Sequence, residues 1–296
     1  MFSLIVCTVD RFDQLERLFQ SLKTQIQPNF EVILVDQNTD GRLVHLVETF
    51  LQFYPIRHIR SPKGLSRARN NGIAAAIGTY VGFPDDDCWY EPDTLAAAER
   101  LFVQSPEIDI VTGRTLDATG TPSVSPTGDQ PLAITRQNYL DCGNSNGIFV
   151  RRSALATIGG FDEDLGVGSE SPFQSGEEAD LLLRALSAGQ TLRYFPTLIV
   201  HHDQVITQYD AAQIARARRY GRGFGALMRK QKFSVFYVGY RLARPFGSWL
   251  IATLRRDAIT REYKWAWLSG IAEGYATWPR WRRRAGARPS GSSTSL

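Results

Sequence analysis

Short apolar segments typical of buried strands alternate with segments of helical periodicity through the first part of this 296-residue chain. The strand-like segments are residues 3–8, 31–36, 56–60, 79–83 and 108–113, and helical spacing of apolar residues separates them. This alternation predicts a mostly parallel sheet with helices on both faces. In such sheets ligands bind at the carboxyl ends of the strands. Because Thr8, Asp36 and Asp85–Asp87 all fall at strand ends, one crevice is expected to collect them.

Three consecutive carboxylates, Asp85, Asp86 and Asp87, follow the apolar segment 79–83 and Pro84. Acidic side chains crowded at the end of a buried strand repel one another and lose hydration. A divalent cation such as Mg²⁺ or Mn²⁺ would relieve this repulsion, because it takes oxygen ligands and bridges phosphate oxygens. A solvated acidic turn would explain the same residues, so the cluster alone leaves both interpretations open.

The net charge of +4 conceals a division of the chain. Residues 204–296 contain 18 Lys and Arg residues but only four Asp and Glu residues, whereas acidic residues predominate before them. We therefore expect an α/β domain over residues 1–203, a basic amphipathic helical region over 204–288 and a disordered tail over 289–296. Three widely spaced cysteines form no zinc-like pattern and indicate a reducing compartment. The first apolar segment has no basic leader, so we expect a first strand there and no signal peptide.

The basic region carries an amphipathic pattern. On a helical wheel Arg241, Arg244 and Arg255 share one side, whereas Leu242 and Trp249 share the other. This pattern is typical of a helix that lies in a membrane interface, and charges within the apolar run argue against a transmembrane helix. Residues 233–284 are therefore expected to bind an anionic membrane surface, the alternative being a helical subdomain packed on the core. No recognised nucleic-acid-binding module accompanies the charge, so no nucleic acid is expected as a partner.

Seven short motifs follow one another in a fixed order between residues 6 and 202. They are Val6–Arg11, Val35–Thr39, Gly64–Gly72, Phe83–Asp87, Gly159–Glu163, Gly176–Leu181 and Val200–His202. Over residues 3–203 this order and spacing resembles the inverting glycosyltransferases of family 2. The resemblance implies that residues 1–203 form a catalytic domain of the A-type glycosyltransferase fold, a nucleotide-binding, mostly parallel sheet flanked by helices. The basic region would then be a C-terminal helical appendage at the membrane interface.

The resemblance implies that the acidic triplet is an Asp-x-Asp motif that holds Mn²⁺ or Mg²⁺. Asp87 is then the expected direct metal ligand, and Asp85 faces the ribose or the metal. Asp86 is assigned with Asp85 to the nucleotide site. His202 is the third candidate metal ligand, and His201 is expected to be structural, because adjacent strand residues point to opposite faces.

The resemblance also implies a nucleotide pocket. Gln37 takes the place usually held by an acid that accepts the pyrimidine N3–H bond, which leaves the base unassigned. Arg69 and Asn70 would face the base and the diphosphate, where a basic residue is electrostatically sensible. The other expected nucleotide-binding residues are Thr8, Asp10, Arg11 and Asp36. Asn144 and Asn146 would lie beside the donor sugar and the acceptor, although a turn that leads into a strand is an equal interpretation.

Inverting sugar transfer needs one carboxylate to take the proton of the acceptor hydroxyl. Glu177 and Glu178 stand just before an apolar helical stretch. The family usually has Glu-Asp here, and Glu178 falls at the Asp position. Glu178 is therefore the expected base and Glu177 its alternative. Acids of a first helical turn that complement the helix dipole would also account for Glu177.

Together these residues predict metal-dependent, inverting transfer of a sugar from a nucleotide-sugar donor to a hydroxyl of a saccharide or lipid-linked saccharide. The protein would be cytoplasmic and peripherally associated with the inner face of the cell membrane. One alternative is a sugar-phosphate nucleotidyltransferase, which would need a glycine-rich basic loop after the first strand, but residues 8–13 contain no glycine. Another is a non-catalytic membrane-associated scaffold of the same fold. The Gly221-x-Gly223-x-Gly225 pattern lacks the spacing of a phosphate loop.

Overall fold

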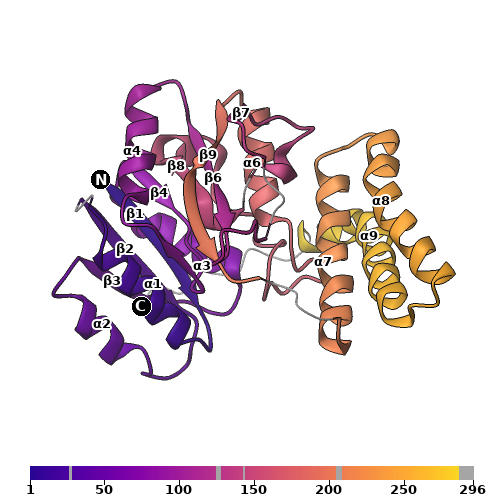
Figure 1. The fold of residues 1–296 in the computed structure, drawn as a ribbon, viewed down its shortest axis with the longest axis horizontal. Helices are drawn as coiled ribbons and strands as arrows, with labels where there is room; N and C mark the ends of the chain where they lie inside the picture. Colours follow the sequence, from indigo (N-terminus) through magenta and orange to yellow (C-terminus); the bar gives the residue numbers. More distant parts are fainter. Residues whose placement is uncertain (27–28, 125–127, 143, 205–208, 287–296) are drawn as a thin grey trace. The chain divides into compact units, whose positions relative to one another are not determined.

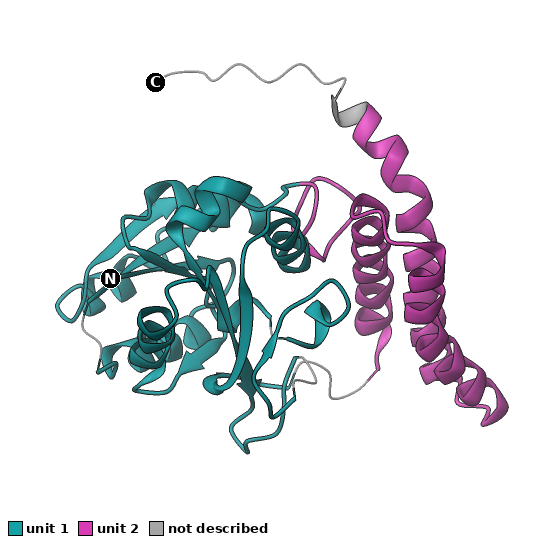
Figure 2. Ribbon diagram, turned by 90° about the horizontal axis from the view of Figure 1, so that it is seen from above, with its two compact units in different colours: residues 1–163, 177–207 teal, residues 164–176, 208–296 magenta. Residues whose placement is uncertain are grey.

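The chain divides into two compact units in a computed structural model that describes residues 1–286, apart from 27–28, 125–127, 143 and 205–208. The first unit contains residues 1–163 and 177–207, and the second contains 164–176 and 208–296 (Figure 2). The second unit therefore includes a short segment from within the predicted 1–203 domain. The predicted tail over 289–296 lies outside the described residues.

The first unit is built on a nine-stranded sheet flanked by helices (Figure 1). Along the sheet the strand order is β3-β2-β1-β4-β8-β6-β9-β5, with β7 paired to β9. The first four of these strands run parallel, as expected, whereas β8 is antiparallel to both β4 and β6. The strands are β1 (Phe2–Thr8), β2 (Phe30–Asp36), β3 (Ile56–Arg60), β4 (Tyr80–Gly82), β5 (Cys88–Tyr90), β6 (Ile110–Leu116), β7 (Leu132–Ala133), β8 (Ile148–Arg151) and β9 (Leu192–His202).

Helices cover the sheet because their apolar residues recur on one side. In α1 the four buried residues, Leu15, Leu18, Phe19 and Leu22, follow the spacing of a single helix face. Every residue of β1 and β2 is buried, which is the pattern of central parallel strands covered on both sides. The helices of this unit are α1 (Asp13–Lys23), α2 (Val44–Phe50), α3 (Leu65–Ala75), α4 (Thr94–Gln104), α5 (Arg152–Ile158) and α6 (Glu177–Ser187), with the 3₁₀ turns η1 (Tyr139–Asp141) and η2 (Ser145–Gly147).

Strand register brings the ends of distant segments together. The parallel pairing of β1 with β2 places Thr8 opposite Asp36. An isolated parallel bridge joins Cys7 to Asp85, so the acidic triplet begins beside the end of β1. At the other edge the antiparallel pairing of β5 with β9 sets Cys88 opposite His202. The residues predicted to share one crevice therefore start from neighbouring points of the sheet.

Three helices form most of the second unit: α7 (Ala211–Lys230), α8 (Val235–Leu254) and α9 (Ala258–Gly286). The glycine pattern at 221–225 lies within α7, where it allows close packing rather than phosphate binding. A Cβ on Gly225 would collide with the carbonyl of Ile271, and a Cβ on Gly274 with that of Arg222. Within the described part of the chain, no helix combines the length and the apolar character that crossing a membrane requires.

We predict that Gly274→Ala destabilises the second unit, because the added methyl group overlaps the backbone of α7. Overpacking of this kind costs about 1–3 kcal/mol, which chemical denaturation followed by circular dichroism would measure. Gly247→Ala is the matched control, since a Cβ there meets no atom within 4 Å. That change should be neutral or stabilising, because Ala is favoured over Gly in helices by about 1 kcal/mol. Equal stability of both variants would contradict the packing assignment.

Candidate active site

The three carboxylates of the acidic triplet have different partners. Asp85 is held by three groups: its Oδ1 accepts from Arg69 at 2.9 Å, its Oδ2 accepts from the Ser145 hydroxyl at 3.0 Å, and its backbone N–H donates to Asn146 at 3.1 Å. Asp86 is buried and accepts a hydrogen bond of 2.6 Å from Arg11. Burial raises the pKa of Asp86 to about 6, although the charge of Arg11 opposes this shift. The middle residue thus lies against the end of β1.

Asp87 is paired with His202, the residue that strand pairing brings to its side. The Nε2 atom of His202 lies 3.2 Å from Oδ1 of Asp87, and Arg11 forms an ion pair with the other oxygen. Burial works against the charged form of Asp87. The hydrogen bond and charge of His202, together with Arg11, nevertheless hold its pKa below the usual range. Asp87 therefore presents an ionised carboxylate beside an imidazole nitrogen.

Asp87 and His202 fit a divalent cation whose coordination would be completed by a substrate. Mg²⁺ and related ions are commonly bound through one or two protein carboxylates together with substrate phosphates, and imidazole suits Mn²⁺ less than oxygen but is an accepted ligand. Within the described ranges, no group of three or more His, Cys, Asp and Glu side chains forms a complete metal site. Asp87 and His202 are therefore the residues that could hold the ion, with Asp85 adjacent but already bonded to Arg69.

Arg69 occupies the centre of the site and is almost completely buried, with 1% of its surface exposed. Its guanidinium reaches Asp85 at 2.9 Å, Glu178 at 3.1 Å and Glu177 at 3.7 Å. Burial disfavours the charge, but these carboxylates raise the pKa of Arg69 above its usual value. Arg69 was predicted to face the base and the diphosphate, and that role stays a prediction. In the structure it joins the acidic triplet to the candidate base.

The two glutamates at the start of α6 differ in accessibility. Glu177 is buried, and its Oε2 has no hydrogen-bond partner among the described residues. Burial and the neighbouring Glu178 charge raise the pKa of Glu177 well above its ordinary value of 4.5, despite the attraction of Arg69. The side chain of Glu178 keeps 25% of its surface exposed. Glu178 is therefore accessible, whereas Glu177 is the enclosed member of the pair, with its pKa shifted toward the protonated form.

The predicted nucleotide-binding residues on β1 and β2 lie together at the strand ends. Asp36 is fully buried, and its Oδ2 atom lies 2.9 Å from Nε2 of His58 and forms an ion pair of 2.8 Å with Arg60. The Gln37 side-chain oxygen accepts the Gly64 backbone N–H at 2.8 Å, so it fixes the loop that begins α3. Asp10 has a positive φ of 57° and donates its backbone N–H to Asn38 at 2.8 Å. Thr8 is buried beside these groups.

The side chains of the three predicted asparagines each form hydrogen bonds with backbone groups. Asn70 donates to the Phe161 carbonyl and accepts from the Phe161 N–H, so its amide binds the Gly159–Glu163 motif instead of projecting freely. Asn144 accepts from the N–H of Asn146 at 3.2 Å and caps η2. Asn146 in turn accepts from the Asp85 N–H. The structure therefore brings Asn146 to the backbone of the acidic triplet, and Asn144 fixes the turn that carries Asn146.

Arg17 lies at this site although no signal in the sequence pointed to it. Arg17 of α1 donates to the Asp87 carbonyl at 2.8 Å and to Asp203 at 2.9 Å, and it lies 4.1 Å above the Trp89 ring. His201 also stacks on the ring of Trp89, with the two ring centroids 5.2 Å apart, and its imidazole pairs with the carboxylate of Glu91. Arg17 is one basic residue on an ordinary amphipathic helix, so only the folded chain reveals it.

A comparison of the sequence with models of protein families finds a match over the first half of the chain. The model for "Glycosyl transferase family 2" matches residues 3–155, which is more than half of the chain. The chain belongs to glycosyl transferase family 2. The predicted family and fold are thus confirmed, and the enzymes of this family are inverting, nucleotide-sugar-dependent transferases.

Curated relatives in the family share part of the chain. A pre-mycofactocin glycosyltransferase of Mycobacterium tuberculosis is 30% identical over 181 residues, which cover 56% of this chain and 35% of that protein. A PGL/p-HBAD biosynthesis glycosyltransferase of Mycobacterium bovis is 27% identical over 166 residues, which cover 55% and 63%. The matched part thus spans about a third of the length of the first relative and less than two thirds of the second.

Solved structures with a similar fold match nearly the whole chain. A mannosyltransferase from Pyrobaculum calidifontis, in complex with GDP-Man and Mn²⁺, has a TM-score of 0.60 at 16% identity and covers 94% of this chain and 86% of its own. TarS of S. aureus, residues 1–349 in complex with UDP-GlcNAc, has a TM-score of 0.55 at 16% identity and covers 94% and 91%. At these identities the likeness shows the fold alone.

We predict that Glu177→Gln changes how stability depends on pH. A carboxyl group whose pKa is raised on folding stabilises the folded chain at low pH, and this contribution is lost as pH rises through the folded-state pKa. The free energy of unfolding of the wild type should therefore fall relative to Glu177→Gln as pH rises above about 4.5, by at most about 1.4 kcal/mol per pH unit. Denaturation at several pH values measures this difference, and a constant difference would contradict a protonated, buried Glu177.

Proposed function

We propose that this protein transfers a sugar, with inversion and with a divalent cation, from a nucleotide-sugar donor to a hydroxyl of a saccharide or lipid-linked saccharide. The observation that carries the proposal is the Arg69 bridge, which connects Glu178 at 3.1 Å to Asp85 at 2.9 Å. A single guanidinium group thus connects a carboxylate that is able to accept a proton with the acidic triplet. Inverting transfer needs these two functions on either side of the reacting sugar.

The donor would bind where the ends of β1, β2 and β4 meet. Asp87 and His202 would hold the cation together with the diphosphate, and the cation, when bound, would neutralise the charge that develops on the leaving diphosphate. The related mannosyltransferase structure with GDP-Man and Mn²⁺ supports a donor and metal of this class. The UDP-GlcNAc complex of TarS supports the same fold with another donor. Gln37, whose oxygen already accepts from Gly64, leaves the base of the donor unassigned.

Glu178 would act on the acceptor. As the acceptor oxygen attacks the anomeric carbon from the face opposite the diphosphate, Glu178 accepts its proton. Arg69 donates a hydrogen bond of 3.1 Å to this carboxylate, which fixes the position of a side chain that remains partly exposed. Glu177 has no such access, because it is buried, and its raised pKa favours the protonated form. This difference favours Glu178 over Glu177 as the base.

The helical unit would attach the enzyme to the inner face of a membrane. In α8 only Ala252 is buried, whereas Phe236 is 86% exposed, Leu254 is 75% exposed and Val235 is 72% exposed. The helix contains Arg241 and Arg244 but no acidic residue. An exposed apolar face with basic residues and no acids supports binding to an anionic lipid surface. The three cysteines are free and buried, which agrees with a reducing compartment.

We predict that Glu178→Gln lowers kcat by about 10²–10⁴-fold, the usual contribution of a general base, with donor affinity retained. The measurement is release of nucleoside diphosphate in the presence of acceptor, alongside donor binding by calorimetry. Glu177→Gln is the matched control, since it makes the same Glu-to-Gln substitution one position away. If Glu177→Gln loses transfer and Glu178→Gln keeps it, Glu177 is the base. A wild type that binds a donor but never releases diphosphate would support the non-catalytic scaffold.

A further inference from the structure

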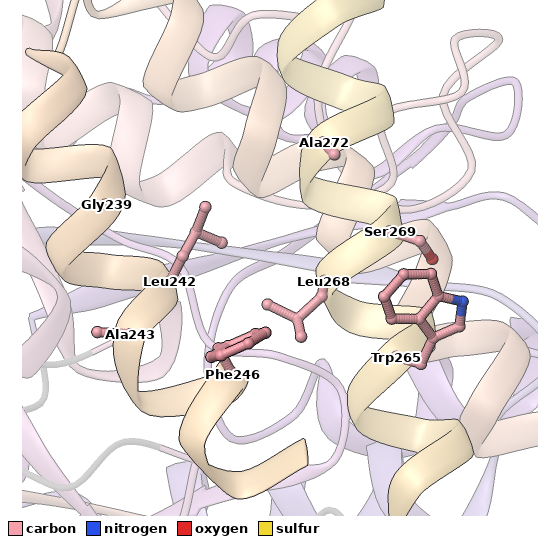
Figure 3. A pocket seen from close by; sticks show the side chains of 8 residues that line it. All are labelled: Gly239, Leu242, Ala243, Phe246, Trp265, Leu268, Ser269 and Ala272. Carbon is pink, nitrogen blue, oxygen red and sulfur yellow. The ribbon is translucent and has the colours of Figure 1, made fainter. Parts of the chain in front are cut away.

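Arg17 and an apolar groove are two features that the proposed function does not use. The groove, of about 490 Å³, lies between α8 and α9. Leu242 and Phe246 point into it from α8, and Leu268 points into it from α9 (Figure 3). Its mostly apolar lining favours no particular occupant. Arg17, by contrast, makes directed polar contacts with the segments on both sides of the candidate cation site.

The antiparallel ladder of β5 and β9 ends beside the candidate cation site. Its last pair is Cys88 with His202. If the register continued, Asp87 and Asp203 would be the next residues opposite each other, but neither belongs to a strand. Like charges directly opposite each other in a sheet are destabilising. The ladder alone therefore does not fix the position of Asp87 relative to His202.

One nitrogen atom of Arg17 bridges the two segments at this point. Its Nη2 atom donates to the Asp87 carbonyl at 2.8 Å and to Oδ2 of Asp203 at 2.9 Å. The guanidinium also lies 4.1 Å from the centre of the Trp89 ring in β5. Stacking on an aromatic face holds a planar guanidinium in a defined orientation. Arg17 thus joins the chain just before β5 to the chain just after β9.

The contact with Asp203 also bears on the imidazole of His202. Nδ1 of His202 donates to the backbone carbonyl of Asp203, which leaves Nε2 toward Asp87 at 3.2 Å. A histidine that binds a metal usually donates its other ring N–H to a carbonyl or a carboxylate in this way, and the bond fixes the orientation of its ring. Because Arg17 holds the side chain of Asp203, it restrains the residue that orients His202.

We propose that Arg17 is a positioning residue that holds Asp87 and His202 at the separation that a divalent cation needs. This inference rests on the proposed function, in which these two residues bind the cation. Their separation of 3.2 Å is close to the value of about 3.0 Å expected for adjacent ligands of an octahedral ion bound at about 2.1 Å. Arg17 reaches the site only through a backbone carbonyl and Asp203. Its loss should therefore weaken binding of the ion and leave the chemical step intact.

The test titrates Mn²⁺ into the full chain, alone and with UDP or GDP, and follows free Mn²⁺ by electron paramagnetic resonance. Arg17→Gln should raise the Kd of Mn²⁺ by about 10–100-fold, the usual effect of removing a group that supports a metal ligand. Saturating Mn²⁺ should restore the kcat of donor hydrolysis in this variant. This recovery distinguishes a positioning residue from one that takes part in transfer.

Arg57→Gln is the matched control. Arg57 donates to the Ala75 carbonyl at 2.8 Å, and its side chain is 47% exposed, against 38% for Arg17. It lies on β3, at the opposite end of the strand order from β5, so its loss should leave the Kd of Mn²⁺ unchanged. The effects of Arg17→Gln and Asp203→Asn on this Kd should be less than additive, because both changes remove the same ion pair.

Other results separate this inference from the function on which it rests. An unchanged Kd in Arg17→Gln, or an equal rise in Arg57→Gln, would overturn the positioning role and leave the cation site standing. A kcat that stays low at saturating Mn²⁺ would also overturn it, because Arg17 would then act in the transfer step itself. If the wild type binds no Mn²⁺ under any of these conditions, the cation site of the proposed function fails as well.

Discussion

The rest of the site depends on one buried cation, the guanidinium of Arg69. It comes from α3, and it contacts Asp85, which follows β4, and Glu177 and Glu178, which begin α6. A buried arginine is tolerated only when carboxylates and hydrogen bonds replace its water. Without the cation, the carboxylates of Asp85 and Glu178 would repel each other. Because removal of one partner of such a buried group costs about 3–5 kcal/mol, the fold and the position of the candidate base are coupled.

The structure places chemically similar acids in different environments. Asp85 is bonded to Arg69, and Asp86 is buried against Arg11, so neither is free to act alone. Asp87 lies at the open side with His202, where an ion and a diphosphate could reach it. Of the two glutamates, the exposed one is able to exchange a proton with an acceptor. The proposed roles thus rest on differences in burial and in cationic partners, and not on differences in residue type.

Local sequence predicted the parts of this site that depend on strand ends. The alternation of apolar periods predicted the parallel strands β1 to β4, and therefore that Thr8, Asp36 and Asp85 meet, because parallel strands end at the same edge. The apolar pattern could not reveal that β8 runs antiparallel, because side chains alternate between the two faces of a strand in the same way in either direction. The contact of Arg69 with Glu178 joins residues 109 positions apart, and nothing in the local sequence records it. The segment 164–176 joins the helical unit through packing of Phe173 on Trp278, a contact of the same long-range kind.

The most direct test of the account is thermal unfolding of the chain with nucleotide sugars in the presence and absence of Mn²⁺. The account predicts that one donor raises the unfolding temperature only when the ion is present, and that Asp87→Ala loses this shift while Glu178→Gln retains it. Retention of the shift by Glu178→Gln follows because the acceptor side of the site does not bind the diphosphate. A shift that is the same without metal, or that survives Asp87→Ala unchanged, would contradict the assignment of Asp87 and His202 to the cation.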